Sequence, residues 1–180
     1  MDWSTIFTIV LGSSFLGTIL NTFVGWRFKR SENLKISNYI ALKLAYLFEG
    51  FACKCLSAAE EHDLAISSNE NAGKYMTRVP KFPKLPEFNY QLFDLKLLDK
   101  VFDFPNQVIF ANESISFLFD VAGMDEGSKE AYKNSLKLAK NSLEIADKIR
   151  SQYDFVQRSL SFGDYSVRDN IKERLKKFKK

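Results

Sequence analysis

The chain opens with an apolar stretch that carries no charge from Trp3 to Trp26 and is followed at once by the basic sequence RFKR. A helix rises about 1.5 Å per residue, so this stretch would be roughly 36 Å long, against about 30 Å for the hydrocarbon core of a bilayer. A signal peptide would carry its positive charge before the apolar run and end in small residues, which this stretch does not do. We therefore predict a transmembrane helix at about residues 4–25, in an anchor of residues 1–30; a buried core helix is the alternative.

The residues that flank this stretch predict its orientation. Trp3 and Trp26 suit the two membrane interfaces, and Arg27, Lys29 and Arg30 follow the apolar run. Because Lys and Arg favour the cytoplasmic side, we predict a single-pass protein of the inner (cytoplasmic) membrane. Its N-terminus would lie outside, and the rest of the chain would be cytoplasmic.

A stripe of small and polar residues runs along the predicted span. Its members are three or four residues apart: Ser14, Gly17, Thr18, Asn21 and Gly25. Small side chains let two helices approach closely, and an Asn side chain can form a hydrogen bond between them. The stripe indicates self-association or a membrane partner. The alternative is a helix that spans the membrane alone, because Gly and Ser are common in such helices and the stripe is not a clean G-x-x-x-G motif.

The rest of the chain shows helical periodicity and no convincing strand pattern. An apolar stripe with steps of three and four runs from Ile36 to Ala58, within a predicted helix of residues 34–65. Residues 93–101 predict a short amphipathic helix, and Pro105 fits the first turn of the next one. That next helix is apolar on more than one face, so we expect it to be the most buried.

A wide apolar face from Tyr132 to Leu160 predicts one further helix, the longest, which would end near Phe162 before Gly163. The width of this face favours packing inside a bundle over a two-stranded coiled coil. The predicted fold class is therefore all-α, with the transmembrane helix followed by an antiparallel helical bundle of residues 31–162.

The segment RVPKFPKLPEF, residues 78–88, repeats every third residue. Pro, apolar and charged residues each recur at this period, which is that of a polyproline II helix. One interpretation is a ligand for a partner domain that recognises P-x-x-P. The apolar edge, which includes Phe82 and Leu85, instead favours an extended strap that lies on the helices, with Lys81 and Lys84 exposed.

Residues 163–180 form a basic tail. They contain seven Lys or Arg and three Asp or Glu, so the net charge of +4 of the whole chain lies here. We predict an amphipathic helix whose apolar edge dips into lipid headgroups or docks on the bundle. The residues predicted to bind anionic lipid are Arg168, Lys172, Lys176, Lys177, Lys179 and Lys180.

Candidate chemistry is sparse in this sequence. Neither a phosphate-binding P-loop nor a G-x-G-x-x-G motif is present. His62 is the single histidine and continues an apolar stripe, so we interpret it as a half-buried packing residue and not as a metal ligand. Cys53 and Cys55 point about 200° apart on a helix, which suits packing better than a mutual disulfide or one metal. No cofactor is predicted.

These observations favour a non-enzymatic protein that binds a protein partner or self-associates at the cytoplasmic face of a membrane. The predicted partners are the lipid bilayer, an unknown protein and other copies of the chain, and no nucleic acid is expected. The alternative is a membrane-acting effector or toxin whose transmembrane helix oligomerises. An enzyme that uses carboxylates alone is a third hypothesis.

Overall fold

The computed structural model describes the backbone of residues 3–69, 71–87, 90 and 93–178, and within these ranges it describes side chains from Asn21 onward. The chain divides into two compact units, Met1–Tyr39 and Ile40–Lys180. The hydrophobic core lies in the second unit, where it begins at Ile40.

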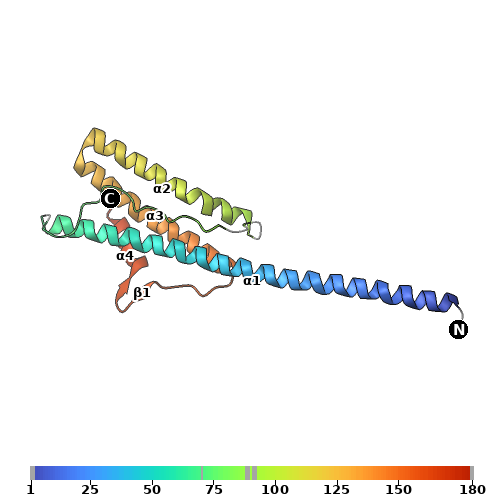
Figure 1. Cartoon of the computed structure of the whole chain (residues 1–180). Coiled ribbons are helices and arrows are strands. Elements are labelled where there is room, and N and C mark those ends of the chain that lie inside the picture. The colour runs from blue at the N-terminus through green and yellow to red at the C-terminus, as the bar shows by residue number, and fades with distance from the viewer. Residues whose placement is uncertain (1–2, 70, 88–89, 91–92, 179–180) are drawn as a thin grey trace. The chain divides into compact units, whose positions relative to one another are not determined.

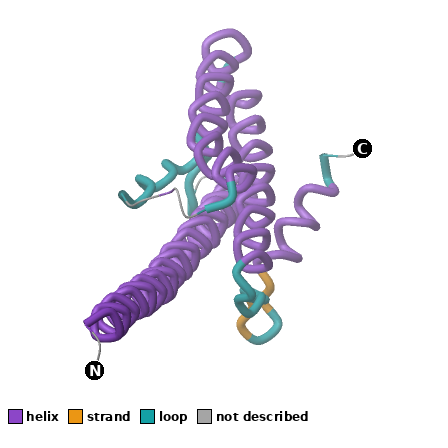
Figure 2. The backbone as a smooth tube through the Cα atoms, turned by 90° about the vertical axis from the view of Figure 1, so that its right-hand side faces the viewer, coloured by secondary structure: helices purple, strands orange, loops and turns teal. Residues whose placement is uncertain are grey.

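The described chain is mostly helical, as the sequence predicts, but it also contains one short hairpin that the sequence does not predict (Figures 1 and 2). The helices are α1 (Trp3–Ser67), α2 (Leu95–Ala122), α3 (Met124–Gln152) and α4 (Val167–Lys176). The strands β1 (Ser161–Phe162) and β2 (Tyr165–Ser166) form an antiparallel pair in which Phe162 faces Tyr165.

The long helices of the second unit pack in an antiparallel manner. Helices α2 and α3 form a helical hairpin around Gly123, which has a φ of 84° that favours glycine. Helix α3 also runs antiparallel to the part of α1 in this unit. The hydroxyl of Ser142 donates to the backbone carbonyl of Phe48 at 2.7 Å, and the hydroxyl of Ser135 donates to the backbone carbonyl of Cys55 at 3.5 Å. The residue numbers therefore rise along α1 as they fall along α3.

Four phenylalanines form the centre of the core. Phe48 and Phe51 come from α1, Phe104 from α2, and Phe82 from the extended segment between them. In every pair but Phe48–Phe51 the ring centroids lie 5.1 to 5.4 Å apart, mostly edge to face, a favourable arrangement for aromatic rings. This cluster fixes the extended segment between α1 and α2.

Helix α2 differs from the two helices that the sequence predicts. It continues through Pro105, because Leu97, Val101, Phe104 and Val108 make one buried stripe across the proline. A proline inside a helix removes one hydrogen bond, and the burial of this stripe offsets that loss. The second half of α2 is not the most buried part of the bundle, since large apolar residues of its outer face are exposed.

Helix α3 ends ten residues before the predicted end. Its last residue is Gln152, and Asp154 has a positive φ of 55° that breaks the helix. The guanidinium of Arg150 donates to the carbonyl of Val156 at 3.0 Å and so holds the chain in a return turn. The predicted apolar position Val156 is 84% exposed. The longest described helix is α1, with 65 residues.

No helix in the described part of the chain is at once long enough and apolar enough to cross a membrane. Side chains of α1 are described from Asn21 onward, and from there charged residues recur from Arg27, so every uncharged run in this part is too short for a crossing. This finding contradicts the predicted transmembrane helix at residues 4–25, the single-pass inner-membrane location and its orientation. The alternative function as a membrane-disrupting effector depended on that helix.

Candidate ligand groove and exposed face of helix α2

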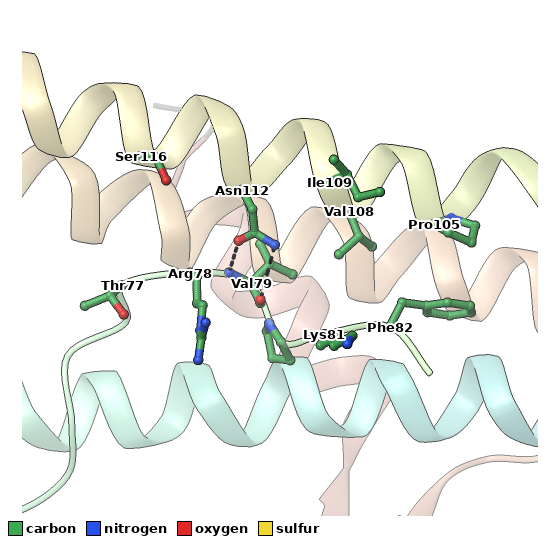
Figure 3. Close-up of a pocket in the computed structure, with 11 residues that line it drawn as sticks. Thr77, Arg78, Val79, Lys81, Phe82, Pro105, Val108, Ile109, Asn112 and Ser116 are labelled. Atoms are coloured by element: carbon green, nitrogen blue, oxygen red, sulfur yellow. Dashed lines mark hydrogen bonds between the residues drawn. The ribbon is translucent and has the colours of Figure 1, made fainter. Parts of the chain in front are cut away.

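The strap of residues 78–88 is held on α2 by a side-chain clamp (Figure 3). The Asn112 side chain accepts the backbone N–H of Val79 at 2.8 Å and donates to the carbonyl of the same residue at 3.4 Å. One amide thereby satisfies both polar backbone groups of a residue that is 1% exposed. The clamp and the burial of Phe82 together fix the strap along the bundle.

This arrangement confirms the predicted structural interpretation of the strap where it is described. Phe82 is 7% exposed, Leu85 packs half-buried against the core, and Lys81 and Lys84 are exposed. Because the apolar edge is committed to the core, the segment does not offer that edge to a P-x-x-P-binding domain. Phe88, the last residue of the predicted strap, lies outside the described residues.

A groove of about 690 Å³ opens between the strap and α2 (Figure 3). Pro105, Val108, Ile109, Asn112 and Ser116 form its α2 wall, at helical steps of three and four that place them on one side. The opposite wall consists of Thr77 and residues 78–82 of the strap. The volume is in the range of about 300–1,000 Å³ that is typical of small-molecule sites.

The charges in this groove are all of one sign. Among the described residues, Arg78 and Lys81 are the two charged ones that line it, both on the strap and both exposed, and no carboxylate lines it. Neither side chain makes an ion pair with any residue that the structure describes. The groove is therefore cationic at its edge and apolar on its floor.

The outer face of α2 is a second exposed surface, on which Phe102 alone makes a ring contact within the described residues, with Tyr90 at 4.7 Å between ring centroids. Six of its large apolar residues are at least 43% exposed: Leu95, Phe102, Ile109, Phe110, Phe117 and Val121. Phe110 and Phe117, one helical heptad apart, are 64% and 63% exposed. Exposed carboxylates stand among them: Asp99, Asp103, Glu113 and Asp120. We call this combination the acidic apolar face of α2.

His62 has the packing role that the sequence predicts, although it is more buried than expected. It is 4% exposed, and its Nδ1 accepts the backbone N–H of Met76 at 3.1 Å. Burial lowers the pKa of His62, and because Nδ1 is an acceptor, the neutral ring carries its proton on Nε2. Among the described residues, no group of three or more His, Cys, Asp or Glu is placed to hold a metal ion.

His62 also lines a small cavity of about 190 Å³ next to the start of α3. Ser128 lines it too, and its buried hydroxyl has no hydrogen-bond partner among the described residues. Asp125 and Lys129 give the lining one charge of each sign. This cavity is small for an organic ligand, and its lining favours neither an anion nor a cation. The groove on α2 is therefore the stronger candidate for a ligand site.

The cysteines have the packing role that their spacing indicates. Both are free thiols, with Cys55 fully buried and Cys53 half-buried. Burial raises the pKa of Cys55 to about 12. A thiol with such a pKa stays protonated near neutral pH and is a poor nucleophile.

The described part of the basic tail docks on the bundle, which is one of the two predicted arrangements. Val167 and Ile171 of α4 are buried, and the guanidinium of Arg168 makes two hydrogen bonds of 2.8 and 2.6 Å with the carboxylate of Asp147. Arg174 pairs with Asp63.

Lipid binding by this tail stays a prediction. Arg168 forms an ion pair with Asp147. Lys172, Lys176 and Lys177 are exposed, and Lys172 lies 3.8 Å from the carboxylate of Asp169. Lys179 and Lys180 lie outside the described residues.

The other predicted site residues belong to the first unit. Asn21, Gly25, Trp26, Arg27, Lys29 and Arg30 are exposed. The guanidinium of Arg30 lies 5.4 Å from the centre of the Trp26 ring, a cation–π distance. Trp3, Ser14, Gly17 and Thr18 lie in the part of α1 whose side chains the structure does not describe, so their roles stay predictions.

The sequence reasoning missed Asn112, Arg78 and the outward face of α2. Asn112 contacts a residue 33 positions away in the sequence, and no local pattern marks such a pair. The two-sided apolar pattern of α2 was visible in the sequence, but it was interpreted as burial on both sides when one side is exposed. Comparisons with models of protein families, with curated proteins and with solved structures found no match.

Proposed function

We propose that this chain is a non-enzymatic helical protein that binds a protein partner, or a second copy of itself, through the acidic apolar face of α2. The observation that carries the proposal is the exposure of six large apolar residues along one helix face. Contiguous exposed apolar surface of this kind marks interaction sites in soluble proteins. Burying Phe110 and Phe117 against a partner would supply the apolar contacts that dominate binding energy.

The carboxylates on this face indicate the chemistry of the partner surface. Asp99, Asp103, Glu113 and Asp120 would meet Lys or Arg residues around an apolar centre, since interfaces pair opposite charges. An amphipathic helix with a basic rim has both features and can pack along the exposed face of α2 as one helix packs on another. The proposed partner surface is therefore a basic amphipathic helix.

Site-specific photo-crosslinking in the cells that make this protein tests the proposal. A photoreactive phenylalanine analogue at position 117 should give one discrete crosslinked species, which the additional Phe110→Gln change should reduce strongly. The matched control is position 162, because Phe162 is 91% exposed on β1, away from α2. Equal crosslinking from position 162, or none from position 117, would contradict the proposal.

A further inference from the structure

We propose that the groove between the strap and α2 binds a small amphipathic anion, an apolar chain that ends in a carboxylate. This inference does not depend on the partner proposed for the outer face of α2, although Ile109 belongs to both surfaces. It rests on the floor of the groove, on the sign of its charges and on its rigidity.

The floor of the groove is apolar and already formed. Val79, Phe82 and Val108 are buried beneath it, and Pro80 and Pro105 line it half-buried. Figure 3 shows Pro105, Val108 and Ile109 on the α2 side above the strap, with Asn112 reaching from α2 to Val79. Two prolines and the Asn112 clamp restrict the walls, so little conformational entropy is lost when a ligand enters.

The charges of the groove select an anion. Arg78 and Lys81 line it without ion-pair partners in the described chain, and none of the carboxylates of α2 lines it. A carboxylate at the edge of the groove would accept charge-assisted hydrogen bonds from these side chains, which are stronger than neutral ones. Both cations are exposed, and exposed side chains change rotamer within nanoseconds, so they can close on a head group.

Hydroxyl groups supply the remaining donors. Thr77, which directly precedes the strap, and Ser116 on α2 line the groove and are exposed. Each hydroxyl can donate one hydrogen bond to a carboxylate. The Asn112 amide is engaged with Val79, so its role is to position the strap and not to contact the ligand.

Calorimetric titration of the full chain with decanoate, below its micelle concentration, tests this inference. Decyltrimethylammonium is the comparison ligand, because it has the same alkyl chain with the opposite charge. The expected result is saturable binding of decanoate and at least tenfold weaker binding of decyltrimethylammonium. Absence of decanoate binding at millimolar concentration, or equal affinity for the two ligands, overturns the inference.

Variants of the strap place the binding at the groove. The double variant Arg78→Gln/Lys81→Gln should weaken decanoate binding at least tenfold. Lys84→Gln is the matched control, since Lys84 is an exposed lysine of the same strap that lies outside the groove lining and pairs with Glu87 at 2.7 Å. An unchanged circular dichroism spectrum shows that each variant folds. If the double variant keeps its affinity, or Lys84→Gln loses as much, the groove is not the site.

Discussion

At Glu49, one buried carboxylate accepts hydrogen bonds from two arginines of the C-terminal half of the chain. Arg150 approaches with Nε at 2.6 Å and Nη2 at 3.2 Å, and Arg158 with Nη1 at 2.8 Å. The ring of Tyr46 lies 5.2 Å from the Arg150 guanidinium and 4.8 Å from that of Arg158. The hydrogen bonds to Glu49 raise the pKa of Arg150, so this guanidinium stays charged, and the cluster holds the turn after α3 on α1.

Removing Glu49 should destabilise the fold strongly. Arg150 is 3% exposed, so Glu49→Ala leaves a buried guanidinium without its counter-ion, and breaking a buried pair in this way costs about 3–5 kcal/mol. Arg158→Gln is the control and should cost less, because the Arg158 side chain is 42% exposed. Urea unfolding followed by circular dichroism measures both free energies. A loss for Glu49→Ala no larger than that for Arg158→Gln would show that the cluster does not have this role.

The stability of the protein should depend on the protonation of His62. Burial lowers the pKa of this residue in the folded state below its usual value of about 6.5. The unfolded chain then binds a proton more readily than the folded chain, so the contribution to stability is present above about pH 6.5 and is lost as the pH falls.

His62→Gln provides the comparison for this pH dependence, because a Gln side chain can accept the Met76 N–H and does not titrate. The free energy of unfolding should fall more steeply for the wild type than for His62→Gln between about pH 7.5 and pH 5. Parallel curves for the two proteins would rule out this role of His62.

At the scale of the elements, local periodicity predicted most of the architecture. The three-residue period of the strap correctly placed Phe82 on the core, and the stripe in residues 34–65 correctly placed Leu44, Phe51 and Cys55. The same reasoning failed at Pro105 and at Val156. In the first case burial outweighs a lost hydrogen bond, and in the second the bond between Arg150 and the Val156 carbonyl redirects the chain. Both causes are tertiary, so a local pattern does not contain them.

Burial of the Phe82 side chain should stabilise the strap more than its prolines do. Phe82→Ala removes a ring that contacts Phe48, Phe51 and Phe104, and buried Phe-to-Ala changes cost about 3–5 kcal/mol. Pro83→Ala, a half-buried neighbour, should cost no more than about 1 kcal/mol, mainly through a freer unfolded chain. Thermal or urea unfolding measures the loss in the free energy of unfolding for each variant. Equal losses would contradict this prediction, because they would show that Phe82 contributes no more to holding the strap than Pro83 does.

At the scale of the whole molecule, the sequence predicted an all-α chain but not the surfaces on which its function is proposed to depend. The groove requires Arg78 and Ile109, which are distant in sequence, to line one cavity. The acidic apolar face exists because α2 packs through Val101, Phe104 and Val108 and leaves Phe110 and Phe117 outside. An apolar pattern on both sides of a helix does not say which side has its partner within the chain.

The most direct test of the proposed partner-binding role is the mass of the complex that the full chain forms when it is isolated from its own cells. Sedimentation velocity should show a species larger than the 20.7 kDa chain for the wild type and for the control Phe162→Gln. The double variant Phe110→Gln/Phe117→Gln should sediment as the single chain with an unchanged helical spectrum, because both residues are exposed. A wild type that sediments as the single chain, or a double variant that keeps the larger mass, would contradict the account.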